Sequence, residues 1–124
     1  MPGKEAFPLP GPASLSTAVR WGDLLSVPGQ APVDPETMAL VSPDAEPQCR
    51  AVLAALGAAA EAAGSGLGLA LAVECFLADP ADFTTWNRVY AELVPAPFPA
   101  RTTVVAGFVV PGLKVEASAV FGIP

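Results

Sequence analysis

Prolines and glycines divide this chain into short runs, and only two of the runs have the spacing of a helix. The 15 prolines and 11 glycines fall largely between apolar stretches, where they exclude the interior of a helix or strand. After a Pro-rich segment (1–14), the pattern predicts strands at 16–20, 24–27, 69–77, 101–110 and 114–120, and helices at 44–63 and 79–93. Such a chain can fold only by packing two helices on a sheet of short strands.

The two helices carry start signals and apolar stripes. Asp44 is expected to cap the first helix and Asp79 the second, where Pro80 suits the first helical position. Residues at helical spacing form the buried stripes: Val52, Leu53, Leu56 and Ala60 in the first helix, and Phe83, Trp86, Val89, Tyr90 and Leu93 in the second. These stripes are interpreted as core.

The order of elements predicts an α+β fold. The sequence reads β-β-α-β-α-β-β, with a hairpin turn at 21–23 and another turn at Pro111-Gly112, so two helices would cover one face of a mixed sheet. The run 69–77 is nearly all apolar, as in a strand covered on both faces. With 52% hydrophobic residues in 124 and apolar side chains gathered at 104–110, a homo-oligomer that buries the free sheet face is expected.

Composition excludes several classes of function. The chain has no histidine, which removes His-dependent nucleophile systems and metal sites. Its two cysteines, Cys49 and Cys75, have no metal-site spacing and are interpreted as buried thiols. A formal charge of −6 disfavours nucleic acid as a partner. The first residues resemble neither a signal peptide nor an anchor, and no apolar run is long enough to span a membrane, so a cytoplasmic protein is expected.

Several separated motifs together resemble the Rid (YjgF) family of reactive-intermediate imine/enamine deaminases. They are Ser16-Thr17-Ala18-Val19, the run 24–30 followed by Asp34-Pro35-Glu36-Thr37, Gln48, Ala62-Ala63-Gly64, Asp82-Phe83, Asn87-Arg88-Val89-Tyr90, Pro99-Ala100-Arg101-Thr102-Thr103-Val104 and Val115-Glu116-Ala117. Each motif alone is weak, but their shared order over most of the chain is specific.

The resemblance implies a chorismate-mutase-like fold and a single domain over 1–124. It also implies a homotrimer with the sheets as an inner barrel and a cleft at each subunit interface. The family hydrolyses 2-imino or 2-enamino acids to 2-oxo acids and ammonia without a cofactor or metal.

The resemblance also assigns candidate catalytic residues. Arg101 matches the arginine that binds the substrate carboxylate, for which its planar fork is suited. Glu116 matches the residue that orients water or relays a proton. Thr103 stands where many members have cysteine, so only its backbone N–H would help to hold the carboxylate. From position alone, Arg101 could instead form a surface ion pair, and Glu116 could simply point to solvent.

Four further residues are expected to contribute to substrate binding. Gly29 would let the backbone approach the ligand, although a plain turn glycine would look the same. Asn87 matches the asparagine of the family's helix, which could equally tie that helix to a loop. Leu15 replaces the family's usual tyrosine beside the ligand, and Pro28 replaces its usual serine. Because both changes remove a hydroxyl, a larger or more apolar substrate than 2-aminoacrylate is expected.

Three functions remain open from the sequence. The first is a general imine/enamine deaminase with an altered pocket. The second is a dedicated enzyme of specialised metabolism acting on an imine, enamine or related intermediate. The third is a non-catalytic trimer that binds a small carboxylate. Ribonuclease activity ranks last, because an acidic chain without histidine offers little for RNA binding or phosphodiester chemistry.

Overall fold

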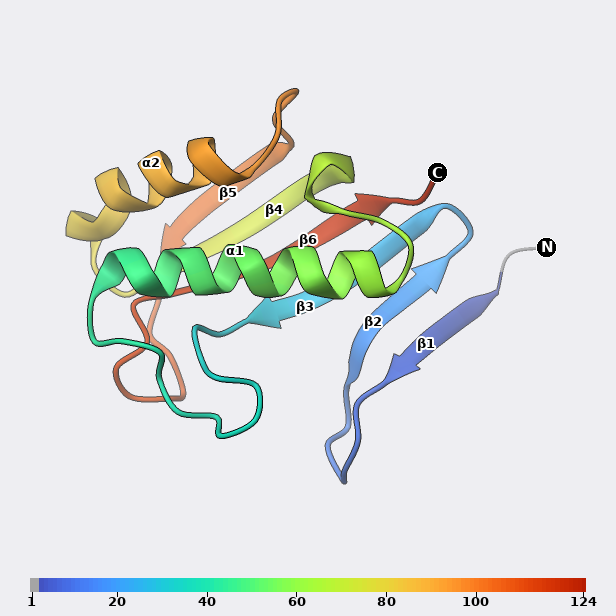
Figure 1. Cartoon of the computed structure of the whole chain (residues 1–124), viewed down its shortest axis with the longest axis horizontal. Coiled ribbons are helices and arrows are strands. Elements are labelled where there is room, and N and C mark those ends of the chain that lie inside the picture. The colour runs from blue at the N-terminus through green and yellow to red at the C-terminus, as the bar shows by residue number, and fades with distance from the viewer. Residues whose placement is uncertain (1–2) are drawn as a thin grey trace.

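A computed structural model describes residues 3–124 and shows two helices packed on one face of a six-stranded sheet (Figure 1). The elements are β1 (Lys4–Pro8), β2 (Ser16–Trp21), β3 (Leu24–Gln30), α1 (Ala45–Ala62), η1 (Leu67–Leu69), β4 (Ala70–Leu77), η2 (Pro80–Asp82), α2 (Phe83–Leu93), β5 (Ala100–Val105) and β6 (Val115–Gly122). The strand order is β1-β2-β3-β6-β4-β5, in which only β4 and β5 run parallel. The predicted α+β fold class is confirmed.

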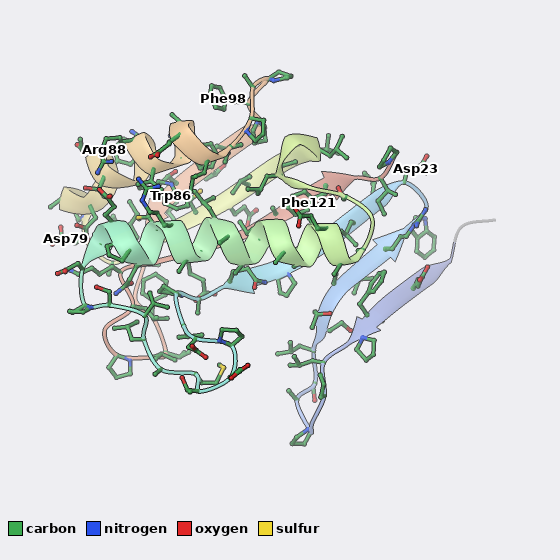
Figure 2. All side chains as sticks on the ribbon, in the orientation of Figure 1. Asp23, Asp79, Trp86, Arg88, Phe98 and Phe121 are labelled. Carbon is green, nitrogen blue, oxygen red and sulfur yellow. The ribbon has the colours of Figure 1, made fainter. Side chains whose placement is uncertain are left out.

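The core lies between the helices and the sheet. The predicted stripe of α1, from Val52 to Ala60, is buried, and so are Trp86 of α2 and Phe121 of β6, which Figure 2 labels on facing layers. Strand β6 alternates buried and half-buried residues, as expected of a strand with one face against helices. Cys49 and Cys75 are buried free thiols, which confirms that interpretation.

The start of α1 differs from the prediction. Asp44 is the N-cap residue, but its side chain makes no capping hydrogen bond. The cap side chain normally accepts from the N–H of the second or third helical residue, and the third residue here is Pro47, which has none. Asp79 does cap, accepting from the Ala81 N–H, although the turn it begins is η2 rather than α2.

The sheet contains one strand that was not expected and one that is shorter than expected. Strand β1 pairs antiparallel with β2 from within the Pro-rich segment. Strand β5 ends at Val105, and residues 106–114 form a loop. The last two strands are not a hairpin, because β4 lies between them and pairs with both.

The sheet face away from the helices is open in the single chain. Trp21 and Leu24 on the β2–β3 hairpin and Val104 on β5 are exposed there. Strand β4 is therefore covered on one face only, since Val73, Cys75 and Leu77 are buried while Glu74 is exposed, contrary to the expectation of two covered faces. The exposed apolar face is the one that the expected oligomer would bury.

A buried glutamine joins the loops at one end of the sheet. The Gln48 side-chain amide, on the first turn of α1, donates to the Ser42 carbonyl at 2.9 Å and the Gly112 carbonyl at 3.1 Å. Its oxygen accepts from the Lys114 N–H at 2.8 Å. Every polar atom of this fully buried side chain thus has a partner, and the loops on either side of it are fixed together.

Candidate functional site

Arg101 lies on the edge strand β5, and helix α2 holds its side chain. Its Nη2 donates to Asn87 Oδ1 at 2.6 Å. Its guanidinium carbon is 4.7 Å from the centre of the Tyr90 ring and 5.9 Å from that of Phe83. Stacking on aromatic rings orients the fork and leaves most of its five N–H donors for a ligand.

The space beside Arg101 is a small surface cavity of about 330 Å³. It is lined by Asn87, Tyr90, Ala91, Phe98, Pro99 and Arg101. Among residues 3–124, no carboxylate lies within ion-pair distance of Arg101. The surface ion-pair interpretation is therefore wrong for the single chain, and this positive charge is available to an anion.

The Tyr90 ring on which Arg101 stacks is a neutral group. Burial raises the pKa of the Tyr90 phenol to about 12. Negative charge on Cys75 in its thiolate form adds to this effect, and the Arg101 charge opposes it. Burial also raises the pKa of the Cys75 thiol. Thr103 and Trp86 can donate hydrogen bonds to its sulfur, and this lowers the pKa in part. Both groups remain uncharged at neutral pH, so no anion in this layer competes for Arg101.

Thr103 does not offer its side chain to the cavity. It lies opposite Cys75 in the β4–β5 register, and its hydroxyl oxygen is buried. Because β5 pairs only with β4, backbone groups along the other edge of β5 have no strand beside them. A contribution from the Thr103 backbone stays a prediction.

Glu116 and Gly29 meet at a second place, on β6 and β3. A Cβ atom built on Gly29 would clash with Glu116 Oε1, so the carboxylate holds its present position only beside a glycine. The flanking residues Val115 and Ala117 are buried against the helices, which directs half-buried Glu116 to the open face of the sheet. The missing side chain at Gly29 therefore provides the space in which the Glu116 carboxylate lies.

Leu15 and Pro28 lie with Gly29 in the wall of a larger cavity of about 670 Å³. Neither Arg101 nor Asn87 lines it. The structure thus gathers the predicted residues into two groups within one chain. We call Arg101, Asn87, Tyr90 and Phe83 the arginine wall, and Leu15, Pro28, Gly29 and Glu116 the glycine wall.

The two walls do not meet within one chain. Arg101 pairs in register with buried Val73 and contacts α2, so its side chain is on the helix-covered face. Glu116 is on the open face of β6, which is separated from β5 by β4. A single copy cannot bring the guanidinium and the carboxylate to one small substrate.

The stacking role of Tyr90 and Phe83 was not predicted from the sequence. Tyr90 is buried in the core as predicted, whereas Phe83 is 43% exposed and its assignment to the core is wrong. A usable signal was present, because Asn87 and Tyr90 are three residues apart and so share a face of the helix. Sequence reasoning also missed the contact between Gly29 and Glu116, which depends on strand register.

Neither a metal cluster nor a membrane helix is found in the part of the chain that the structure describes. No three His, Cys, Asp or Glu side chains of residues 3–124 are arranged to hold a metal ion. No helix within these residues has both the length and the hydrophobicity required to cross a membrane.

Comparisons with known proteins agree with one another. A family model described as endoribonuclease L-PSP matches residues 9–121. The RutC family protein y4sK of Sinorhizobium fredii is 39% identical over 108 residues, covering 87% of this chain and 86% of that protein. Reactive Intermediate Deaminase A, chloroplastic, of Arabidopsis thaliana is 38% identical over 95 residues, covering 74% of this chain and 51% of that protein.

Solved structures show the same fold. The Rid family protein YyfA from Yersinia pestis superimposes with a TM-score of 0.89 at 27% identity, covering 98% of this chain and 100% of that chain. TdcF from E. coli, solved with bound serine, gives a TM-score of 0.83 at 29% identity, covering 96% of this chain and 94% of that chain.

Proposed function

Because the chain belongs to the Rid (YjgF/RutC) family, we propose that it hydrolyses 2-imino and 2-enamino acids to 2-oxo acids and ammonia. The observation that carries the proposal is the arginine wall, where a stacked, unpaired guanidinium faces a small cavity. That geometry suits bidentate binding of a carboxylate. The serine bound by TdcF, an amino acid with the same carboxylate, is consistent with such a ligand.

The chemistry requires few groups. Arg101 binds the carboxylate, and Glu116 accepts a proton as water attacks C2 of the imine. The protonated imine thereby becomes a neutral carbinolamine. Glu116 returns the proton to its nitrogen, ammonia leaves, and the hydroxyl gives its own proton to Glu116 as the C=O bond of the 2-oxo acid forms. A 2-enamino acid first gains a proton at C3, which gives the protonated imine directly. Water supplies the oxygen, and no electrons are transferred.

The site is completed by a second copy of the chain. Since one copy cannot bring Arg101 and Glu116 together, the arginine wall of one copy faces the glycine wall of the next. The exposed apolar face of the sheet supports such an assembly, and the family resemblance implies a trimer.

The first test is turnover. Imino acids generated in place by an amino-acid oxidase, with side chains from small to aromatic, are supplied to the wild type, Arg101→Ala and Glu116→Gln. We expect wild-type release of 2-oxo acid above background, and loss of that release in both variants. Arg88→Ala is the matched control, because Arg88 lies on α2 next to Asn87 but pairs with Glu46.

The second test is complementation between inactive chains. Arg101→Ala and Glu116→Gln chains are co-expressed, so that some interfaces contain both intact residues. Random mixing in a ring makes about a quarter of the interfaces intact, and about a quarter of the wild-type activity should return. No recovery in a mixed oligomer, or a monomer by light scattering, would contradict the shared site.

The remaining functions predict other results. A dedicated enzyme of specialised metabolism would turn over simple imino acids poorly and a bulkier intermediate well. A binding protein would retain ligand affinity in Glu116→Gln and show no turnover. RNA is disfavoured by the charge of −6, despite the description of the family model. The cytoplasmic location stays a prediction, because named relatives include chloroplastic and mitochondrial proteins.

A further inference from the structure

The cavity of about 670 Å³ behind the glycine wall is far larger than a small imino acid needs. It lies between helix α1, the loop after β3 and the β1–β2 connection, and we call it the α1 groove. On α1 it is lined by Ala55, Ala58, Ala59 and Ala62, and Met38 and Leu9 lie across from the helix. Protein cavities of roughly 300–1,000 Å³ hold organic ligands.

The groove has no charged side chain in its wall. Its polar members include Thr17, whose hydroxyl donates to the Phe7 carbonyl at 3.1 Å, and Gln30, whose amide donates to the Pro28 carbonyl at 2.8 Å. The Ser16 hydroxyl is a further polar member, and the rest of the wall is apolar, so a polar ligand would find few partners. The groove therefore suits an apolar, uncharged occupant.

The groove borders the proposed reaction site at Gly29, and Glu116 itself does not line it. Leu15, Pro28 and Gly29 line it, and Gly29 is also the residue against which the Glu116 carboxylate lies. A substrate whose reacting carbon is near Glu116 would have its side chain at the mouth of the groove.

We infer that the α1 groove binds the side chain of the substrate, and that the preferred substrate is a 2-imino acid with an extended alkyl chain. The inference rests on the proposed function. From Ala55 to Ala62 the groove follows about 10 Å of helix, which is long enough for a medium-length alkyl chain. The reaction at C2 is unchanged, because the alkyl chain takes no part in it.

Binding of unbranched 2-oxo acids tests the inference directly, because these products are stable probes. Pyruvate, 2-oxohexanoate and 2-oxodecanoate are titrated into the full-length oligomer by calorimetry. We expect affinity to rise about fourfold for each added methylene until the groove is full, equivalent to ~0.8 kcal/mol.

Two matched variants locate the alkyl chain. Ala58→Phe adds a ring in the groove, whereas Ala54→Phe adds the same ring on an exposed part of α1 outside it. Ala58→Phe should weaken binding of 2-oxodecanoate at least tenfold and leave pyruvate binding within about twofold. Ala54→Phe should change neither, which controls for effects on the helix.

The outcomes separate the two proposals. If pyruvate binds in an Arg101-dependent way but affinity does not rise with chain length, the groove inference is overturned and the proposed function stands. A neighbouring copy that fills the groove would give this result. Equal losses in Ala58→Phe and Ala54→Phe would also overturn it. Failure of every 2-oxo acid to bind, with no turnover, would overturn both.

Discussion

The two walls of the candidate site are built in different ways. In the arginine wall, Asn87, Tyr90 and Phe83 of helix α2 hold one charged side chain by three contacts. In the glycine wall, a single carboxylate lies against Gly29, and the neighbouring surface is apolar. The first wall is fixed for a group that every 2-imino acid shares, and the second is shaped by what differs among substrates. The contrast teaches that binding of the common carboxylate and choice of side chain can change independently.

The largest expected effect comes from breaking the arginine wall while keeping its charge. Arg101→Lys retains a cation but loses the planar fork, so kcat/KM should fall about 100-fold, equivalent to ~2.7 kcal/mol. Steady-state kinetics measure the loss, and Arg88→Lys is the control. Activity within threefold of wild type would show that the fork does not bind the carboxylate.

The glycine wall can be broken by one methyl group. Gly29→Ala would place a Cβ against Glu116 Oε1 and displace that flexible carboxylate. The Gly29 backbone is not left-handed, so alanine adds no backbone strain there. We expect kcat to fall about tenfold with KM little changed. Gly107→Ala is the matched control, since no heavy atom lies within 4 Å of its added Cβ. A rise in KM alone would place Glu116 in binding rather than in proton transfer.

A smaller change should sharpen the contrast by restoring polarity to the glycine wall. Leu15→Tyr adds a ring and a hydroxyl, whereas Leu15→Phe adds the ring alone. The hydroxyl should shift the kcat/KM ratio toward small polar substrates about fivefold relative to Leu15→Phe. Competition between a short and a long imino acid measures the ratio, and identical ratios in the two variants would refute a role for this hydroxyl.

The smallest effect concerns Tyr90 of the arginine wall at alkaline pH. The pKa of Tyr90 is raised from 10.0 to about 12, so the folded state favours the protonated phenol, and its stabilisation is lost as pH rises above 10. Between pH 7.5 and 10.5 the free energy of unfolding of the wild type should fall by about 0.8 kcal/mol more than that of Tyr90→Phe. Urea unfolding at the two pH values provides the measurement. An equal loss in both proteins would show that the phenol titrates normally.

Local sequence patterns predicted most of the helices and strands. The errors concern which strands pair with one another in the sheet. The stripe of α1 and the β2–β3 hairpin are visible in the sequence because they depend on near neighbours. Strand β1 was missed because its prolines obscure an edge strand whose partner, β2, supplies its stability. Strand β5, which precedes the loop 106–114, pairs parallel with β4, and strand propensity could not predict that pairing.

The sequence identified candidate site residues but did not show how they are arranged in space. Motif matches singled out Arg101 and Asn87, and the structure brings them together. The contact of Gly29 with Glu116 and the α1 groove depend on the register of distant strands, which spacing along the chain does not contain. The division into two walls is likewise a property of the sheet.

The buried Gln48 side chain has a consequence for local unfolding. Its hydrogen bonds join segments 64 and 66 residues apart in sequence, at Gly112 and Lys114. Opening either loop would leave part of the buried amide without a partner, so the two loops should open together. In hydrogen exchange, amides of 39–42 and 112–114 should therefore exchange as one cooperative unit.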